Sequence, residues 1–61
     1  MQMKIGDVVR ETKHNDIGTV IGVPSEKAPY YIVRFDASGK VPYTEAQVAS
    51  GALRMLTPVT L

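Results

Sequence analysis

Short apolar runs alternate with turn-forming residues along the whole chain. Clusters of Gly, Pro, Asn, Asp and Ser recur every eight to twelve residues, a spacing typical of small all-β sandwiches and barrels. The pattern predicts five strands, over residues 7–12, 18–23, 30–35, 40–43 and 53–56. Residues 1–61 are expected to form one domain, with residues 57–61 as a loosely held tail.

The third predicted strand, residues 30–35, shows the clearest alternation of side chains. Successive side chains of a strand point to opposite faces. One face holds two aromatic residues and a valine and is the predicted core face: Tyr31, Val33 and Phe35. The other face is mixed and is predicted to lie toward solvent: Tyr30, Ile32 and Arg34.

Glycine and proline mark the turns and irregularities of the predicted sheet. Gly18 and Gly22 lie inside the second strand and indicate a bulge or the close approach of another backbone. Prolines at both ends of residues 24–29 indicate a loop, because proline has no amide hydrogen to donate. Gly39 suits the positive φ of a hairpin turn, and Pro42 indicates that the fourth strand is an edge or bulged strand.

A capping box precedes the last predicted strand. In Thr44-Glu45-Ala46-Gln47 a hydroxyl stands at the N-cap and a glutamine follows three residues later, which satisfies two backbone N–H groups at a helix start. The motif predicts one helical turn over residues 45–49, and Gly51 suits the left-handed residue that ends a helix. Five strands with one helical turn before the last strand predict an all-β, SH3-like barrel.

Composition limits the classes of function. The chain has no cysteine, which excludes a thiolate metal site and fits a reducing compartment. The first residues lack the apolar run of a signal peptide, and no stretch approaches the roughly 20 apolar residues of a membrane span, so we expect a cytoplasmic protein without membrane contact. Seven Lys and Arg against six Asp and Glu, interspersed along the chain, give a net charge of +1 and no basic run typical of nucleic-acid binding.

No catalytic constellation is visible, and we predict a non-catalytic protein without a cofactor. His14, the only histidine, stands in a polar loop beside Asp16 and does not supply the three convergent ligands of a metal site. The six acidic residues are scattered singly over turns and strand ends. They therefore offer no carboxylate pair for general acid–base catalysis.

The mixed face of residues 30–35 is the candidate binding surface. Tyr30, Ile32 and Arg34, joined by Arg10 from the first strand as its expected neighbour, would combine an aromatic ring, an aliphatic side chain and guanidinium groups. Tyrosine and arginine are enriched at binding hot spots, which predicts a protein partner. A homo-oligomer would bury the same face against a second copy. If this face has no binding function, Tyr30 is expected to pack under the loop of residues 24–29, and Arg34 is an ordinary exposed strand residue.

A weaker hypothesis concerns nucleic acid. Four residues of basic type would bind phosphate if their segments met at one rim of the barrel: Lys13, His14, Lys27 and Lys40. A tyrosine can also stack on a base. Salt-dependent affinity would distinguish this hypothesis from protein binding.

Motifs of a known type of small barrel occur in several segments. The chain opens with Ile5-Gly6-Asp7-Val8-Val9-Arg10, has His14 and Ile17-Gly18-Thr19-Val20 next, and continues with Tyr31-Ile32-Val33-Arg34-Phe35-Asp36 and Ala52-Leu53-Arg54-Met55-Leu56. In these motifs it resembles the Tudor-like or KOW-like barrels at the C-termini of bacterial repair helicases and in transcription-coupling regulators. The resemblance implies a protein- or nucleic-acid-binding adapter, in some relatives docking on RNA polymerase. Those barrels usually have Phe or Tyr where this chain has Ile17.

A second resemblance would imply an enzyme. The segments Gly6 to Arg10, Gly18 with Gly22, and Gly39 to Tyr43 are similar to the plasmid-borne type of dihydrofolate reductase. In that family four chains form a pore lined by a Val-Gln-Ile-Tyr run. This chain has Val41-Pro42-Tyr43 instead, and Glu11 stands where that family has a basic residue. Because the glutamine is missing, a self-assembling barrel related to this reductase is the third hypothesis, which the mass of a tetramer and cofactor binding would distinguish.

Overall fold

The computed structural model describes residues 3–56, which form five strands and one short helix. In chain order the elements are β1 (Val8–Glu11), β2 (Ile17–Gly22), β3 (Tyr30–Phe35), β4 (Gly39–Thr44), α1 (Glu45–Ala49) and β5 (Leu53–Met55). The strands form one sheet in the order β4-β3-β2-β1-β5, and every neighbouring pair is antiparallel. The all-β class and the helical turn before the last strand are confirmed, and the bounds of β3 and α1 agree with the prediction.

The other strands differ from the prediction by one residue at one or both ends. Asp7 precedes β1 because it belongs to a turn, in which its N–H donates to the carbonyl of Lys4 (3.0 Å) and its carboxylate accepts the N–H of Lys4 (2.9 Å). Leu56 follows β5, although its N–H still donates to the carbonyl of Val8 (2.8 Å). The tail predicted for residues 57–61 lies outside the described residues.

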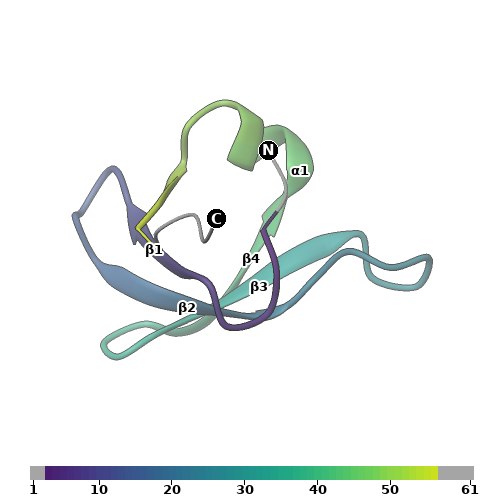
Figure 1. Ribbon diagram of the computed structural model, residues 1–61, viewed down its shortest axis with the longest axis horizontal. Helices are drawn as coiled ribbons and strands as arrows, with labels where there is room; N and C mark the ends of the chain where they lie inside the picture. Colours follow the sequence, from purple (N-terminus) through teal and green to yellow (C-terminus); the bar gives the residue numbers. More distant parts are fainter. Residues whose placement is uncertain (1–2, 57–61) are drawn as a thin grey trace, which may run out of the picture.

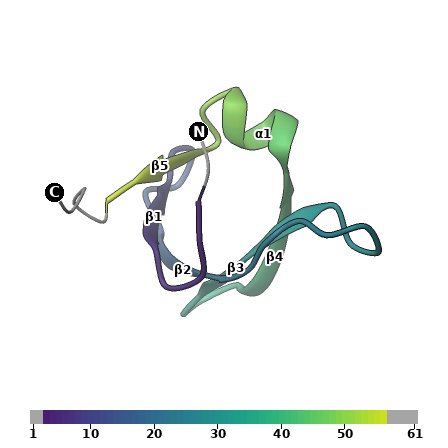
Figure 2. The same ribbon diagram turned by 45° about the vertical axis from the view of Figure 1, so that its right-hand side comes forward.

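The sheet is strongly curved (Figures 1 and 2). In Figure 2, β1 and β5 lie across from β4, with β2 and β3 between them, and α1 joins the end of β4 to β5. The concave side encloses the core: Met3, Val9, Val20, Tyr31, Val33, Phe35, Tyr43, Val48 and Leu53. The predicted core face of β3 is confirmed, because its three residues all belong to this core.

The two glycines of β2 have different structural roles. Gly18 pairs with Phe35 of β3, and a Cβ on Gly18 would lie only 2.7 Å from carbons of the Phe35 ring and of the Val33 side chain. Gly22 lies at a β-bulge, where the register between β2 and β3 shifts after Val20. The predicted bulge is therefore present, and the close neighbour of Gly18 is an aromatic side chain rather than a backbone.

The predictions made from glycine, proline and the capping box in the last third of the fold are confirmed. Gly39 and Gly51 have positive φ values of 76° and 95°, and Pro42 lies on β4, an edge strand of the sheet. In the capping box the Thr44 hydroxyl accepts the N–H of Gln47 (3.1 Å), and the Gln47 side chain accepts the N–H of Thr44 (2.8 Å). These contacts fix α1 between β4 and β5, and Val48 of α1 enters the core.

Candidate functional site

The outer, convex face of the sheet carries the binding residues predicted on β3. Burial alternates along this strand, so that Tyr30 and Arg34 are exposed and Ile32 is half-buried, while the residues between them are buried. Tyr30 retains 42% of its exposure and is therefore not enclosed by the loop of residues 24–29. These three side chains share one face, as their spacing predicts.

Arg10 lies on the same face but not beside β3. The strand β2 separates β1 from β3, and Arg10 pairs with Ile17 whereas Arg34 pairs with Thr19. Standard sheet spacings place the two arginines about 10 Å apart across the strands and about 7 Å apart along them. The expectation that the first and third strands are neighbours is wrong, because the chain inserts β2 between them.

Four cations on the outer face form two like-charged pairs. Arg34 stands directly opposite Lys40 in the β3–β4 pair, and Arg10 stands directly opposite Arg54 in the β1–β5 pair. All four side chains are exposed. Among residues 3–56 the one ion pair joins Glu11 to His14, so no carboxylate of this part of the chain neutralises the four cations. We call Arg10, Arg34, Lys40 and Arg54 the basic band.

An apolar patch lies beside the basic band, toward the β2–β3 loop. Its members are outward residues of three adjacent strands: Ile21, Tyr30, Ile32 and Pro42. Ile21 retains 37% of its exposure, and Ile32 pairs with Pro42 across β3 and β4. Uncharged Ile17 and Thr19 of β2 separate the two charged pairs of the basic band. The outer face therefore combines an apolar half with a positive half.

The acidic residue of the strands is directed away from this face. Glu11, the one acid within the five strands, accepts the N–H groups of Lys13 (2.8 Å) and His14 (2.6 Å), and its carboxylate lies 2.9 Å from the His14 Nδ1. Desolvation opposes ionisation, but these hydrogen bonds and the charge of His14 outweigh it and hold the pKa of Glu11 below 4.5. Glu11 therefore stabilises the β1–β2 loop as a carboxylate.

Two acids affect the ionisation of a core tyrosine. Burial raises the pKa of Tyr43 above its ordinary value of 10.0, and the carboxylates of Glu11 and Asp16 add to this shift. The alternation of β1, in which Val9 is a core residue and Arg10 is exposed, also turns Glu11 toward the inner side of the sheet. Within β1 the cation and the acid therefore lie on opposite faces, with Arg10 in the basic band and Glu11 on the inner side.

The four residues predicted to bind phosphate do not share one rim, because Lys27 lies at the end of the sheet opposite the other three. Lys13 and His14 belong to the β1–β2 loop and Lys27 to the β2–β3 loop, and these two loops lie at opposite ends of an antiparallel sheet. Lys40 lies on β4, opposite Arg34. The expectation of a common rim is wrong, since antiparallel strands send consecutive loops to alternate ends.

Sequence reasoning overlooked Arg54 and Pro42 as members of the outer face. Arg54 stands between two core-facing residues of β5, and Pro42 stands between two inward residues of β4. The alternation of side chains along a strand indicates an outward direction for both positions. Their neighbours on the adjacent strands follow only from the pairing of the sheet.

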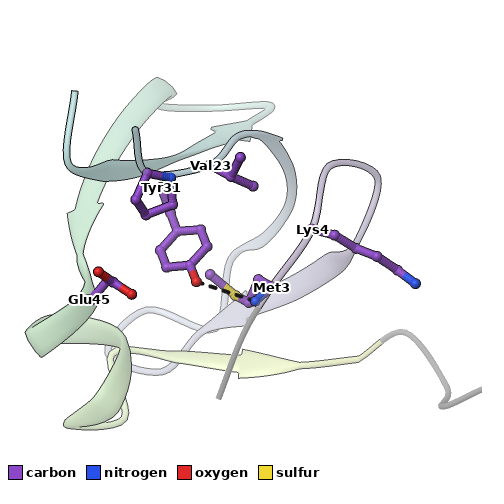
Figure 3. Close-up of a pocket in the computed structure, with 6 residues that line it drawn as sticks. Met3, Lys4, Val23, Tyr31 and Glu45 are labelled. Atoms are coloured by element: carbon purple, nitrogen blue, oxygen red, sulfur yellow. Dashed lines mark hydrogen bonds between the residues drawn. The ribbon is translucent and has the colours of Figure 1, made fainter. Parts of the chain in front are cut away.

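An open hollow of about 470 Å³ lies at one end of the barrel-like sheet (Figure 3). It is lined by residues from the N-terminal segment, the start of the β2–β3 loop, β3 and α1: Met3, Lys4, Val23, Pro24, Tyr31 and Glu45. The Tyr31 hydroxyl accepts the N–H of Met3 at 3.5 Å, and the Lys4 side chain points away from Tyr31. The described residues that line this hollow do not direct a set of polar groups toward one point. We therefore assign no function to it.

The described part of the chain shows neither a metal-ligand cluster nor a membrane helix. Within residues 3–56 no three His, Cys, Asp or Glu side chains are grouped to hold a metal ion, and no helix there has the length and apolarity to cross a bilayer. No protein-family model matches the chain, and neither a curated protein nor a solved structure matches it. The outer face must therefore be interpreted from its own chemistry.

Proposed function

We propose that this protein is a non-catalytic binding module that docks a protein partner through the outer face of its sheet. The observation that carries the proposal is the presence of Tyr30 and Arg34 on one exposed face, with Ile32 between them and Pro42 beside Ile32. Both residue types are enriched at binding hot spots. Because they project from a paired strand, little backbone freedom would be lost on binding.

The strand order supports a narrower classification. Five antiparallel strands with a helical turn between the fourth and fifth are consistent with an SH3-like barrel of the Tudor-like or KOW-like type. On that basis the proposal extends to a cytoplasmic adapter of the transcription or repair machinery. Val41 and Tyr43, at the position of the reductase pore motif, pack in or against the core, which supports a function without catalysis.

The basic band favours nucleic acid as a second candidate partner. Four exposed cations without a neutralising carboxylate among residues 3–56 would attract a phosphate backbone. Tyr30, however, is the one aromatic residue exposed on the described part of the outer face, whereas proteins that bind single strands usually stack several bases on successive aromatic rings. Protein binding is therefore the better-supported function.

Affinity capture with folded variants tests the proposal. The full chain, Tyr30→Ala and Arg34→Ala would be immobilised and exposed to a cell lysate with and without nuclease treatment, with Lys27→Ala in the β2–β3 loop as the control. We expect the full chain and the control to retain a protein that both outer-face variants lose, which mass spectrometry would identify. Equal recovery by all four proteins would refute the site. Recovery that requires intact nucleic acid would favour the second candidate. Circular dichroism would establish that the variants are folded.

A further inference from the structure

The arrangement of charge on the outer face restricts the chemistry of its partner. Each member of the basic band stands directly opposite another cation, Arg34 against Lys40 and Arg10 against Arg54. Like charges directly opposite each other in a sheet are destabilising. Negative groups of a partner would relieve this repulsion on binding, which gives an acidic partner an advantage beyond simple attraction.

The apolar patch adds a second requirement. Ile32 and Pro42 form the cross-strand pair next to Arg34 and Lys40 along β3 and β4. An acidic group bound at the charged pair would thus have an apolar surface one step along the same two strands. A partner that fits both surfaces carries apolar side chains close to its acidic ones.

We infer that the partner is an acidic protein segment with interspersed apolar side chains, which binds across the basic band and the apolar patch. This inference rests on the proposed function and specifies the partner of the same face. The segment would place its carboxylates against Arg34, Lys40 and the second charged pair, and its apolar residues against Ile32 and its neighbours.

Two other occupants fit the same face less well. A two-fold dimer would press this face against its own copy, so that four cations would meet four cations. A nucleic-acid strand would satisfy the cations but would leave isoleucine and proline side chains of the patch without a stacking partner. Charge complementarity together with the apolar patch favours the acidic protein segment.

Binding of defined probes tests the inference on the full chain. The probes are a labelled peptide that alternates Glu with Leu, the same peptide with Lys in place of Glu, a peptide with Ser in place of Leu, and single-stranded oligo-dT. Fluorescence anisotropy would be measured at low and at near-physiological salt. We expect the Glu–Leu peptide to bind most tightly, with an affinity that falls as salt increases because the charges are exposed.

Two charge-reversal variants separate binding from folding. Arg54→Glu and Lys40→Glu would each weaken binding of the Glu–Leu peptide by about tenfold. Each would also place a carboxylate opposite the remaining arginine of its pair, so its Tm is expected to rise by a few degrees. Lys27→Glu, which makes the same change of net charge in the β2–β3 loop, is expected to leave the affinity unchanged.

Each result decides for or against the acidic segment. Absence of binding to the Glu–Leu peptide at low salt overturns the inference, and so does tighter binding of oligo-dT or equal binding of the peptide that lacks Leu. A molecular mass from light scattering that rises with protein concentration, and that Arg54→Glu alters, would indicate a second copy and also overturn it. If the lysate capture still depends on Tyr30 in those cases, the proposed function stands and only the partner chemistry fails.

Discussion

Replacing Gly18 with alanine is expected to destabilise the protein without changing any polar contact. The added Cβ would lie 2.7 Å from carbons of Phe35 and Val33, whereas carbon atoms normally approach to about 3.5–4.0 Å. The neighbours must therefore move by about 1 Å in a close-packed core, a distortion that typically costs about 1–3 kcal/mol. The lower entropy of alanine in the unfolded chain offsets about 0.5–1 kcal/mol. The middle of these two ranges gives an expected net loss of about 1 kcal/mol.

This loss is large for a domain of 61 residues, whose total free energy of unfolding is expected to be about 3–9 kcal/mol. Urea unfolding followed by far-UV circular dichroism would measure the change in the free energy of unfolding. Thermal unfolding should show Tm lowered by about 4–8 °C for each kcal/mol. Because Gly18 contributes to the concave core and not to the outer face, peptide binding below Tm should be unchanged.

Two controls identify the clash as the cause. At Gly22 the atoms nearest to an added Cβ are side-chain carbons of Ile32, at 3.1 Å and 3.3 Å, so Gly22→Ala should cost less than Gly18→Ala. In a Phe35→Leu background the two ring contacts are removed while the contact with Val33 remains, so Gly18→Ala should cost less than it does in the original chain. A Gly18→Ala variant as stable as the original protein would refute the packing of Phe35 over Gly18.

Three further predictions concern the turns and the capping box. Thr44→Ala removes the acceptor for the Gln47 N–H and should lower the unfolding free energy by about 1 kcal/mol in urea titrations. Thr44→Ser keeps a hydroxyl at this position and should retain most of the stability that the cap provides. Asp7→Ala removes the buried acceptor of the Lys4 N–H and should cost about 1–2 kcal/mol, whereas Asp7→Asn should cost less. Because the folded pKa of Glu11 lies below 4.5, its charge stabilises the protein above that pH and loses this effect as the pH falls through the folded pKa. The difference in stability between the original chain and Glu11→Gln should therefore be present at neutral pH and vanish in strong acid.

The sequence predicts those parts of the fold that depend on near neighbours. Alternation along residues 30–35 identifies Tyr31 as inward and Tyr30 as outward without knowledge of the rest of the sheet. The capping box likewise acts within four residues, from Thr44 to Gln47. Strand ends are less certain because they depend on single hydrogen bonds, such as those that hold Asp7 in a turn before β1.

The outer face is harder to predict because it is assembled from distant parts of the chain. Arg10 meets Arg54 only because β5 pairs with β1, and Arg10 is separated from Arg34 only because β2 pairs with both β1 and β3. The sequence shows a net charge of +1 with interspersed signs. Pairing brings four of the cations together in the basic band on the outer face, an arrangement that no local pattern contains.

The like-charged pairs link the stability of the sheet to its proposed function. Each pair costs up to about 1 kcal/mol relative to a neutral one, against a total of only about 3–9 kcal/mol for a domain of this size. An acid at either position of a pair would strengthen the sheet, so Arg54 and Lys40 do not serve stability where they stand. Uncharged Ile17 and Thr19 between the pairs offer no compensating carboxylate. Binding of an acidic partner would account for both features, because the partner supplies the missing negative charge and the repulsion in the free protein then favours the complex.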